Sequence, residues 1–241
     1  MSSIAIEVCV DNVLSLQRAA EAGADRIELC SALELGGLTP SAGFMLAATQ
    51  VNVPVHAMIR PRAGDFEFTP GEVDQMIDDV RACREVGLDG VVIGASADRW
   101  INETALEALV EAAGGLSVTL HRVFDLIEDP VLAIDQAADL GIDHILTSGR
   151  GQSALRGIDN IRHYVELADD RLSIMAGGGI HAGNAAEIVQ KTSVRALHGS
   201  FGRATRQYDR AITAHGFSAG ESLVVTDGDV VKAVRDAVDS L

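Results

Sequence analysis

A four-residue phrase occurs twice near the start of the chain, and it constrains the fold more than any other feature. Residues 6–9 read I-E-V-C and residues 27–30 read I-E-L-C. Between them, residues 11–22 carry apolar side chains at helical spacing, and Asp11 or Asn12 is suited to begin that helix. This arrangement predicts a β-α-β unit with two parallel strands.

Alternation along these two strands separates an apolar face from a polar face. Side chains two positions apart share a face of a strand, so Glu7 lies with Cys9 and Glu28 lies with Cys30. Parallel neighbours are only about 4.8 Å apart, so equivalent residues of the two copies should sit side by side. We therefore expect two thiols and two carboxylates to meet inside the sheet.

The alternation of strands and helices continues along most of the chain. Further strands are expected at residues 53–59, 88–93, 116–121, 143–147, 171–176 and 194–199. The triplets G-x-D at 23–25, 87–89 and 141–143 each end a helix before a strand, where glycine supplies a left-handed cap. These features predict an α/β fold, a (β/α)8 TIM barrel, from eight strands in total.

Length supports this assignment. The chain has 241 residues, close to the roughly 250 that are typical of one TIM barrel, so we expect a single domain over residues 1–241. The alternative is a doubly wound open sheet. That fold would normally carry a phosphate-binding turn after its first strand, where this chain has C-V-D-N instead.

The C-terminal part departs from the alternation. Residues 202–222 show no strong periodicity, which predicts an irregular segment that serves as a lid or a partner surface. A closing helix is expected at residues 229–238, where valines form an apolar stripe.

The charge balance excludes several classes of partner. Lys and Arg number 19 against 35 acidic residues, for a formal charge of -16, and such a chain repels phosphate backbones and anionic membranes. No apolar stretch reaches membrane-spanning length. We expect a cytoplasmic protein that binds neither nucleic acid nor membrane, with its 3 cysteines reduced and outside any disulfide framework.

Candidate functional residues follow from the fold, because TIM barrels place their sites at the carboxyl ends of the strands. Carboxylates there can act as bases, histidines as acids or bases, and arginines can orient an anion. The candidate catalytic cluster is Glu7, Glu28, Arg60, His121 and His198. Glycines after strand seven expose backbone N–H groups, so a candidate anion site comprises Gly177, Gly178, Gly179 and Ser200.

These residues also allow purely structural roles. The two glutamates can belong to an ion-pair network with Arg60 or Arg122 that fills the barrel. His121 can be a core histidine that bonds Thr119 or a carbonyl group. The thiols of Cys9 and Cys30 can be small apolar fillers of a barrel layer.

Longer strings, in this order along the chain, resemble the CutC family. They are G-A-D-R-I-E-L-C-S at 23–31, G-G-L-T-P-S at 36–41, M-I-R-P-R-x-G-D-F at 58–66, H-R-x-F-D at 121–125, L-T-S-G at 146–149 and G-G-G-I at 177–180. The resemblance implies a cytoplasmic TIM barrel, usually a homo-oligomer, with a role in copper homeostasis. It also implies copper(I) binding by thiols that match Cys9 and Cys30, and soft thiolates do select that ion.

Two functional hypotheses therefore stand side by side. One is copper(I) binding through Cys9 and Cys30 at the barrel rim. The other is an enzyme or sensor for a small phosphorylated or carboxylated metabolite, which would use the charged cluster and the glycines. The sequence leaves open whether the chain catalyses any reaction, because one fold hosts many activities.

Overall fold

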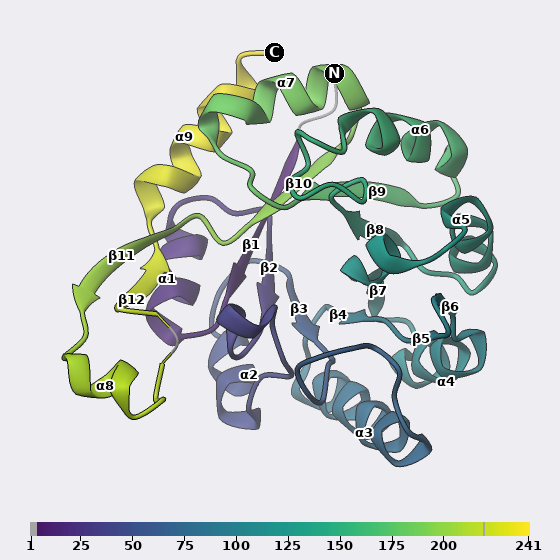
Figure 1. The fold of residues 1–241 in the computed structure, drawn as a ribbon, viewed down its shortest axis with the longest axis horizontal. Helices are drawn as coiled ribbons and strands as arrows, with labels where there is room; N and C mark the ends of the chain where they lie inside the picture. Colours follow the sequence, from purple (N-terminus) through teal and green to yellow (C-terminus); the bar gives the residue numbers. More distant parts are fainter. Residues whose placement is uncertain (1–3, 219) are drawn as a thin grey trace.

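The computed structural model describes residues 4–218 and 220–241. Eight parallel strands close into a barrel in the order β1-β10-β9-β8-β7-β4-β3-β2, and helices surround it (Figure 1). The barrel strands are β1 (Ala5–Val10), β2 (Arg26–Leu29), β3 (Val55–Met58), β4 (Gly90–Ile93), β7 (Ser117–Leu120), β8 (His144–Thr147), β9 (Ser173–Gly177) and β10 (Ala196–Gly199). Each overlaps its predicted range, so the predicted TIM barrel is confirmed.

Helices connect the strands. They are α1 (Val13–Glu21), α2 (Ala42–Ala48), α3 (Pro70–Val86), α4 (Glu103–Ala113), α5 (Pro130–Asp139), α6 (Ile158–Ala168), α7 (Ala182–Thr192), α8 (Arg210–Ala214) and α9 (Gly228–Asp239), with 3-10 turns η1 (Leu33–Leu35) and η2 (Arg122–Leu126). A small hairpin of β5 (Ser96–Ala97) and β6 (Trp100–Ile101) follows β4. Within the two described ranges, no helix is long and apolar enough to cross a membrane.

Local sequence signals explain where these helices begin and end. The Asn12 side chain accepts a hydrogen bond from the Ser15 backbone N–H and so begins α1. Gly23, Gly87 and Gly141 have φ of +85°, +88° and +79°, a conformation that glycine adopts without steric cost. The three predicted glycine caps are therefore correct.

The barrel wall separates an apolar layer from a more polar interior. Outward-facing Ile6, Val8, Ile27 and Leu29 are fully buried in one continuous core with the helices. The interior contains two smaller apolar clusters: Cys30 with Met58 and Val92, and Leu146 with Met175 and Ala196. Charged and polar groups fill much of the remaining interior, so they must pair with one another or with a ligand.

The register of β1 and β2 corrects one prediction. Glu7 lies opposite Arg26, and Cys9 lies opposite Glu28. Equivalent residues of the repeated phrase are therefore not side by side, because β2 is displaced by two residues relative to the repeat. Strands of a closed barrel are tilted and staggered, and a sequence repeat does not reveal that stagger.

The segment after β10 corrects a second prediction. Instead of an irregular stretch, β11 (Gly202–Gln207) pairs antiparallel with β12 (Ser222–Thr226), and α8 lies in the connection between them. The hairpin projects from the barrel beside α1 (Figure 1). All side chains of β11 are exposed, so no apolar alternation marks this strand in the sequence. The predicted closing helix is correct as α9, which begins at the Asp227 cap.

Candidate functional site

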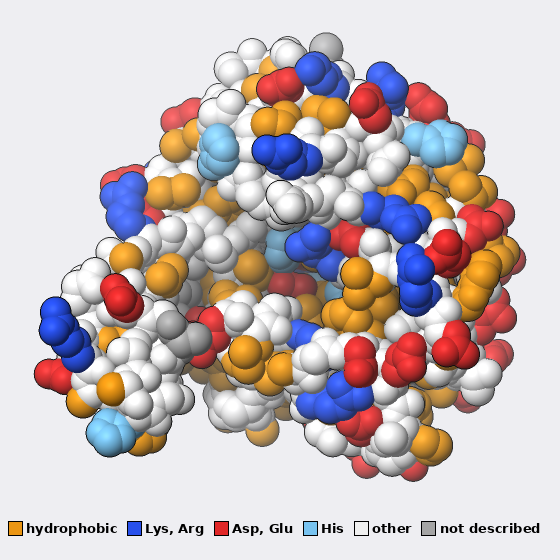
Figure 2. Space-filling model, viewed as in Figure 1, with side chains coloured by type: hydrophobic (Ala, Val, Ile, Leu, Met, Phe, Trp, Pro, Cys, Tyr) orange, Lys and Arg blue, Asp and Glu red, His pale blue; other side chains and the backbone are white. Residues whose placement is uncertain are grey.

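A cavity of about 320 Å³ opens at the carboxyl ends of the barrel strands. Figure 2 shows a hollow near the middle of one face, where basic, acidic and histidine side chains meet. The cavity is lined by Cys9, Glu28, Leu33, Gly36, Met58, Arg60, Phe66, His121, Arg122, Leu146, Gly178, Gly179, His198, Gly199 and Ser200. Of the candidate residues, Glu28, Arg60, His121, His198, Gly178, Gly179, Ser200 and Cys9 therefore share one cavity.

Glu7 lies beneath this cavity rather than in its wall. It lines a separate hollow of about 360 Å³ together with Arg26, His56 and His144. The Glu7 carboxylate forms an ion pair with the Arg26 Nε and accepts a hydrogen bond of 2.7 Å from His198 Nδ1. Glu7 thus belongs to a buried ion-pair network, the structural alternative considered above, but its arginine is Arg26 and not Arg60 or Arg122.

This pairing fixes the charges of two buried groups. Burial opposes the charged form of Glu7, but the bond from His198 and the charge of Arg26 lower its pKa to about 2. Burial likewise opposes a charged His198, yet nearby Cys9, Glu28 and Glu7 raise its pKa well above the usual range. At neutral pH, His198 is therefore an imidazolium that points its second nitrogen away from Glu7.

That second nitrogen faces a candidate metal site. His198 Nε2 lies 3.8 Å from Glu28 Oε2, and donor atoms of Cys9, Glu28 and His198 all lie within 4.8 Å of one another. This separation is close to twice the usual zinc–ligand distance of about 2.0–2.3 Å. A donor set of one sulfur, one nitrogen and one oxygen suits a borderline metal ion. Copper(I) favours a different donor set, two thiolates.

Cys30 lies outside this three-donor group, as judged from the described residues. Its side chain is fully buried, and its Sγ donates to Glu28 Oε2 at 3.4 Å. A Cβ atom on Gly37 would come within 3.1 Å of that sulfur, so the Gly37 backbone covers it closely. Burial raises the pKa of Cys30 well above its usual range, which favours the neutral thiol.

Arg60 follows β3 and is held in place by backbone oxygens. Its Nη1 donates to the Leu35 oxygen at 2.8 Å and its Nη2 to the Gly64 oxygen at 2.9 Å. The guanidinium also lies 4.7 Å from the centre of the Phe66 ring. These contacts use the terminal nitrogens, and the buried Nε of Arg60 has no hydrogen-bond partner within the described residues.

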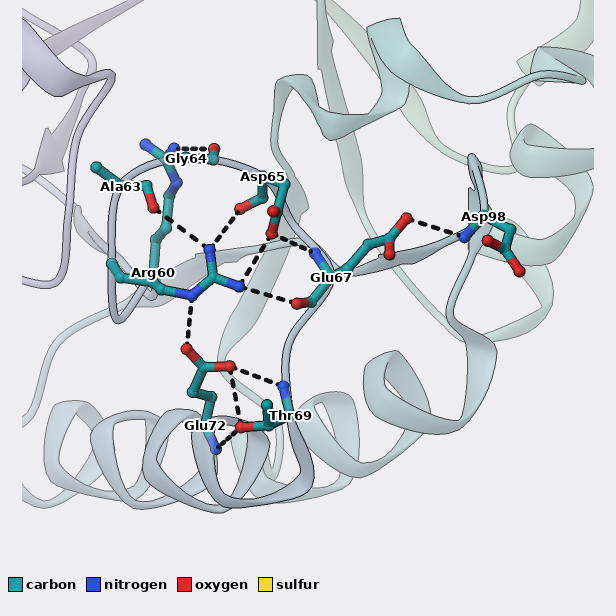
Figure 3. A network of polar contacts seen from close by, with 9 residues as sticks. Arg60, Ala63, Gly64, Asp65, Glu67, Thr69, Glu72 and Asp98 are labelled. Carbon is teal, nitrogen blue, oxygen red and sulfur yellow. Dashed lines mark hydrogen bonds and ion pairs between the residues drawn. The ribbon is translucent and has the colours of Figure 1, made fainter.

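The loop after Arg60 is itself anchored (Figure 3). Arg62 donates to Glu72 on α3 at 2.6 Å and to Asp65 at 2.9 Å. Glu67 accepts a hydrogen bond from the Asp98 backbone N–H, which lies in the β5–β6 hairpin. Both ends of the loop are therefore tied down, and Phe66 is held against the cavity.

His121 follows β7 and is neutral. Its Nδ1 accepts a 3.1 Å hydrogen bond from the Val123 backbone N–H, so the proton of the neutral ring is on Nε2. Burial and the charge of Arg60 lower the pKa of His121 to about 3. The Phe66 ring packs on it with centroids 4.8 Å apart. His121 therefore presents an N–H donor and no charge.

The three glycines at the end of β9 and directly after it differ in role, because one permits close packing and two line the cavity. A Cβ on Gly177 would lie 2.6 Å from Leu146 Cδ1, so this residue permits close packing and does not line the cavity. Gly178 and Gly179 have φ of +97° and +74° and do line it. Beside them, Arg122 donates to Ser148 Oγ at 2.7 Å and to Asp125 at 2.8 Å.

Several buried polar atoms around the cavity have no hydrogen-bond partner within residues 4–218 and 220–241. They are Glu28 Oε1, Arg60 Nε, Thr119 Oγ1 and His121 Nε2. Unpartnered buried groups cost free energy, and they commonly mark a place where water, an ion or a ligand binds. Three of these four residues line the cavity.

Sequence reasoning missed Arg26, His56 and His144, which surround Glu7 in the lower part of the barrel. Arg26 could have been found, because it alternates with Glu28 on the polar face of the same strand. His56 is almost fully buried, and burial with the charge of Arg26 lowers its pKa to about 4. No pattern in the sequence identifies His56 or His144 as neighbours of Glu7.

The closed parallel barrel defines a TIM-barrel protein, and its polar cavity lies at the carboxyl ends of the strands, where such barrels place their sites. The chain belongs to the CutC family, whose sequence profile matches residues 4–203. A CutC family protein of Photobacterium profundum is 45% identical, covering 98% of this chain and 99% of that protein. One from Caulobacter vibrioides is also 45% identical, with 96% of each chain covered.

Solved structures agree with this assignment. The crystal structure of CutC from Streptococcus agalactiae, described there as a proposed copper homeostasis protein, superposes with a TM-score of 0.79 at 36% identity. The match covers 82% of this chain and 98% of that one. A thiamine phosphate pyrophosphorylase from Pyrococcus furiosus matches at a TM-score of 0.60 and 17% identity, which is a likeness of fold alone.

Proposed function

We propose that the rim cavity binds a small phosphorylated or carboxylated compound, and that the chain acts on it as an enzyme or senses it. The observation that carries the proposal is the set of unpartnered donors at the cavity, Arg60 Nε and His121 Nε2, as found within the described residues. An acidic compound with oxygen acceptors would satisfy both donors.

The local charge supports an anionic ligand. Arg60, Arg122 and the imidazolium of His198 line the cavity, and Glu28 is the acidic residue among the lining side chains that the structure describes. This cationic pocket lies within a chain of formal charge -16. Clefts concentrate the field of their own lining charges, so the pocket favours anions even though the surface as a whole does not.

The glycine turn supplies the other half of the proposed contact. Gly178 and Gly179 come between β9 and α7, and Ser200 follows β10 at the same rim. Backbone N–H groups at such a turn, together with the Arg122 guanidinium, form an anion site of the kind that many barrels use after strands seven and eight.

The test is calorimetric titration with 2-phosphoglycolate, which carries both a phosphate and a carboxylate. Arg122→Gln should weaken binding by about 10- to 100-fold, because a charge-assisted hydrogen bond contributes roughly 1.5–3 kcal/mol. The matched control is Arg81→Gln, which removes an exposed arginine of α3 that pairs with Asp78. Equal affinities for the wild type and Arg122→Gln would contradict an anion site at this rim.

Metal binding is a second candidate, because donor atoms of Cys9, Glu28 and His198 converge. Glu7 behind His198 reproduces the carboxylate–histidine arrangement that orients metal ligands. The family and its Streptococcus agalactiae relative point to copper. Bound copper(I) would be held by Cys9 and His198, and Cys30 would contribute as the second thiol if the side chains rearrange. A competition titration with a chromogenic copper(I) chelator tests this candidate.

Copper(I) binding by both Cys9 and Cys30, a cytoplasmic location and a homo-oligomeric state stay predictions from the sequence. For the two thiols, their different burial favours an order in which an incoming ion would meet them. Cys9 lines the cavity, whereas Cys30 is sealed beneath Gly37 and Met58. An incoming ion would therefore reach Cys9 first.

A further inference from the structure

The unpartnered polar atoms of the residues that line the rim cavity are of two kinds. His121 and Arg60, from the ends of β7 and β3, present N–H donors. Glu28, from β2, presents a carboxylate oxygen. The Oε1 of Glu28 and the two donor nitrogens have no partner within the described part of the chain. A ligand that satisfies all three atoms must offer an acceptor to the two nitrogens and a hydrogen to the Glu28 oxygen.

We infer that the ligand is a small carbonyl compound bearing a phosphate or carboxylate group, and that Glu28 removes a proton from the carbon next to its carbonyl. This inference rests on the proposed anion site, which would hold the acidic end of the compound. His121 Nε2 and Arg60 Nε would then donate to the carbonyl oxygen.

The proposed step is balanced within the site. The C–H bond breaks, and its proton goes to Glu28 Oε1. The electron pair forms a carbon–carbon double bond, while the carbonyl π pair moves onto oxygen to give an enolate. Returning a proton or a solvent deuteron to the same carbon restores the carbonyl group and completes an exchange, so the step needs no oxidant, reductant or co-reactant.

The protonation state of His121 agrees with its role. The low pKa of His121, about 3 from burial and the charge of Arg60, keeps the ring neutral and its Nε2–H available as a donor. A neutral imidazole can stabilise a developing oxyanion by hydrogen bonding without first losing its proton.

Both donors are held in place before any ligand arrives. Phe66 contacts the His121 ring and the Arg60 guanidinium, at 4.8 Å and 4.7 Å between centres. Backbone oxygens of Leu35 and Gly64 fix the terminal nitrogens of Arg60. Such preorganised donors stabilise a transition-state charge without reorganising at the moment of reaction.

The positions of the lysines exclude one way of activating a carbonyl group. The sequence contains two lysines, Lys191 and Lys232, and both are exposed on helices, in α7 and α9. Neither lines the cavity, so a side-chain amine cannot activate the carbonyl as an imine. Within the described residues, His121 Nε2 and Arg60 Nε are the buried, unpartnered donors of the lining residues, and we assign them to the carbonyl oxygen.

Deuterium exchange tests the inference. The wild-type protein is incubated in D2O with dihydroxyacetone phosphate, glyceraldehyde 3-phosphate, pyruvate and 2-oxobutyrate, and binding and exchange of carbon-bound hydrogen are both measured by NMR. We expect at least one compound to bind and to exchange faster than without protein. Glu28→Gln should keep binding within about threefold and lose at least about 100-fold in exchange rate, the usual contribution of a general base.

The control variant is His163→Gln, which changes an exposed histidine on α6 and should leave exchange unchanged. Binding without exchange, or equal exchange by the wild type and Glu28→Gln, would overturn the inference while leaving the anion site in place. If none of the four compounds binds, the proposed function fails together with the inference.

Discussion

Glu7 and His198 lie on adjacent strands of the barrel, β1 and β10, and their side chains meet 2.7 Å apart in its interior. Arg26 from β2 closes the group on the other side of Glu7. The three charges link the lower part of the barrel to the cavity above, because His198 lines that cavity. The same buried carboxylate therefore joins the ion pair inside the barrel to a side chain of the cavity wall.

Replacing Glu7 by alanine should destabilise the fold. The change leaves Arg26 and His198 without their shared partner, and breaking a buried pair in this way costs about 3 to 5 kcal/mol. Chemical denaturation measures the free energy of unfolding. The matched control is Glu187→Ala, which removes the exposed pair with Lys191 and should cost less than about 1 kcal/mol. Similar losses in the two variants would show that Glu7 is solvated.

The Glu7 pairing was only partly predictable from the sequence. Alternation along residues 6–9 correctly placed Ile6 and Val8 outward in the helix-facing core and Glu7 inside. The repeat suggested that Glu7 faces Glu28, whereas the stagger of the strands brings Arg26 opposite it. Register depends on how the whole barrel closes, and no local pattern records it.

Alkaline pH should weaken the fold through His198. Burial opposes the charge on this residue, but its acidic neighbours raise its pKa well above the usual 6.5, so the folded protein holds the proton more tightly than the unfolded chain. The stabilisation is complete below the unfolded pKa and is lost as pH rises through the folded pKa. Over that window the free energy of unfolding should fall by about 1.4 kcal/mol per pH unit.

The measurement is the difference between the wild type and His198→Gln across a series of pH values. Stability of the variant should decline less steeply above pH 6.5, the ordinary pKa, because glutamine carries no proton to lose. Parallel curves for the two proteins would mean that His198 does not titrate differently in the folded state.

Acid should weaken the fold through His121. Its pKa is lowered from 6.5 to about 3 by burial and by the charge of Arg60. The unfolded chain therefore binds a proton that the folded protein refuses, and stability is lost as pH falls from 6.5 toward that value. In the His121→Gln variant, the free energy of unfolding should fall less steeply with decreasing pH. The difference in slope should correspond to about one proton. An unchanged slope would mean that His121 is charged in the folded state.

The two thiols should differ in metal binding. If the ion is held by Cys9, Glu28 and His198, Cys9→Ser should remove tight binding, because a hydroxyl is a poor donor for soft ions. Cys30→Ser should change the affinity little. Copper(I) affinity is measured by competition with a chromogenic chelator. Equal losses for the two variants would favour the two-thiol site that the family resemblance implies.

Sequence reasoning identified most of the rim but could not show how its parts are used. Their places at the carboxyl ends of predicted strands correctly led to His121, Gly178 and Gly179 at one cavity. The roles of Arg26 and Phe66 depend on contacts between distant segments. The hairpin of β11 and β12 was missed because backbone pairing, and not side-chain burial, defines β11.

The most direct test of the central claim is a crystal structure of the protein grown with both 2-phosphoglycolate and copper(I), with anomalous data collected at the copper edge. We expect phosphoglycolate density in the rim cavity, with its acidic groups against Arg122 and the Gly178–Gly179 backbone. A cavity that holds only solvent, with a copper peak bridging Cys9 and Cys30, would contradict the account.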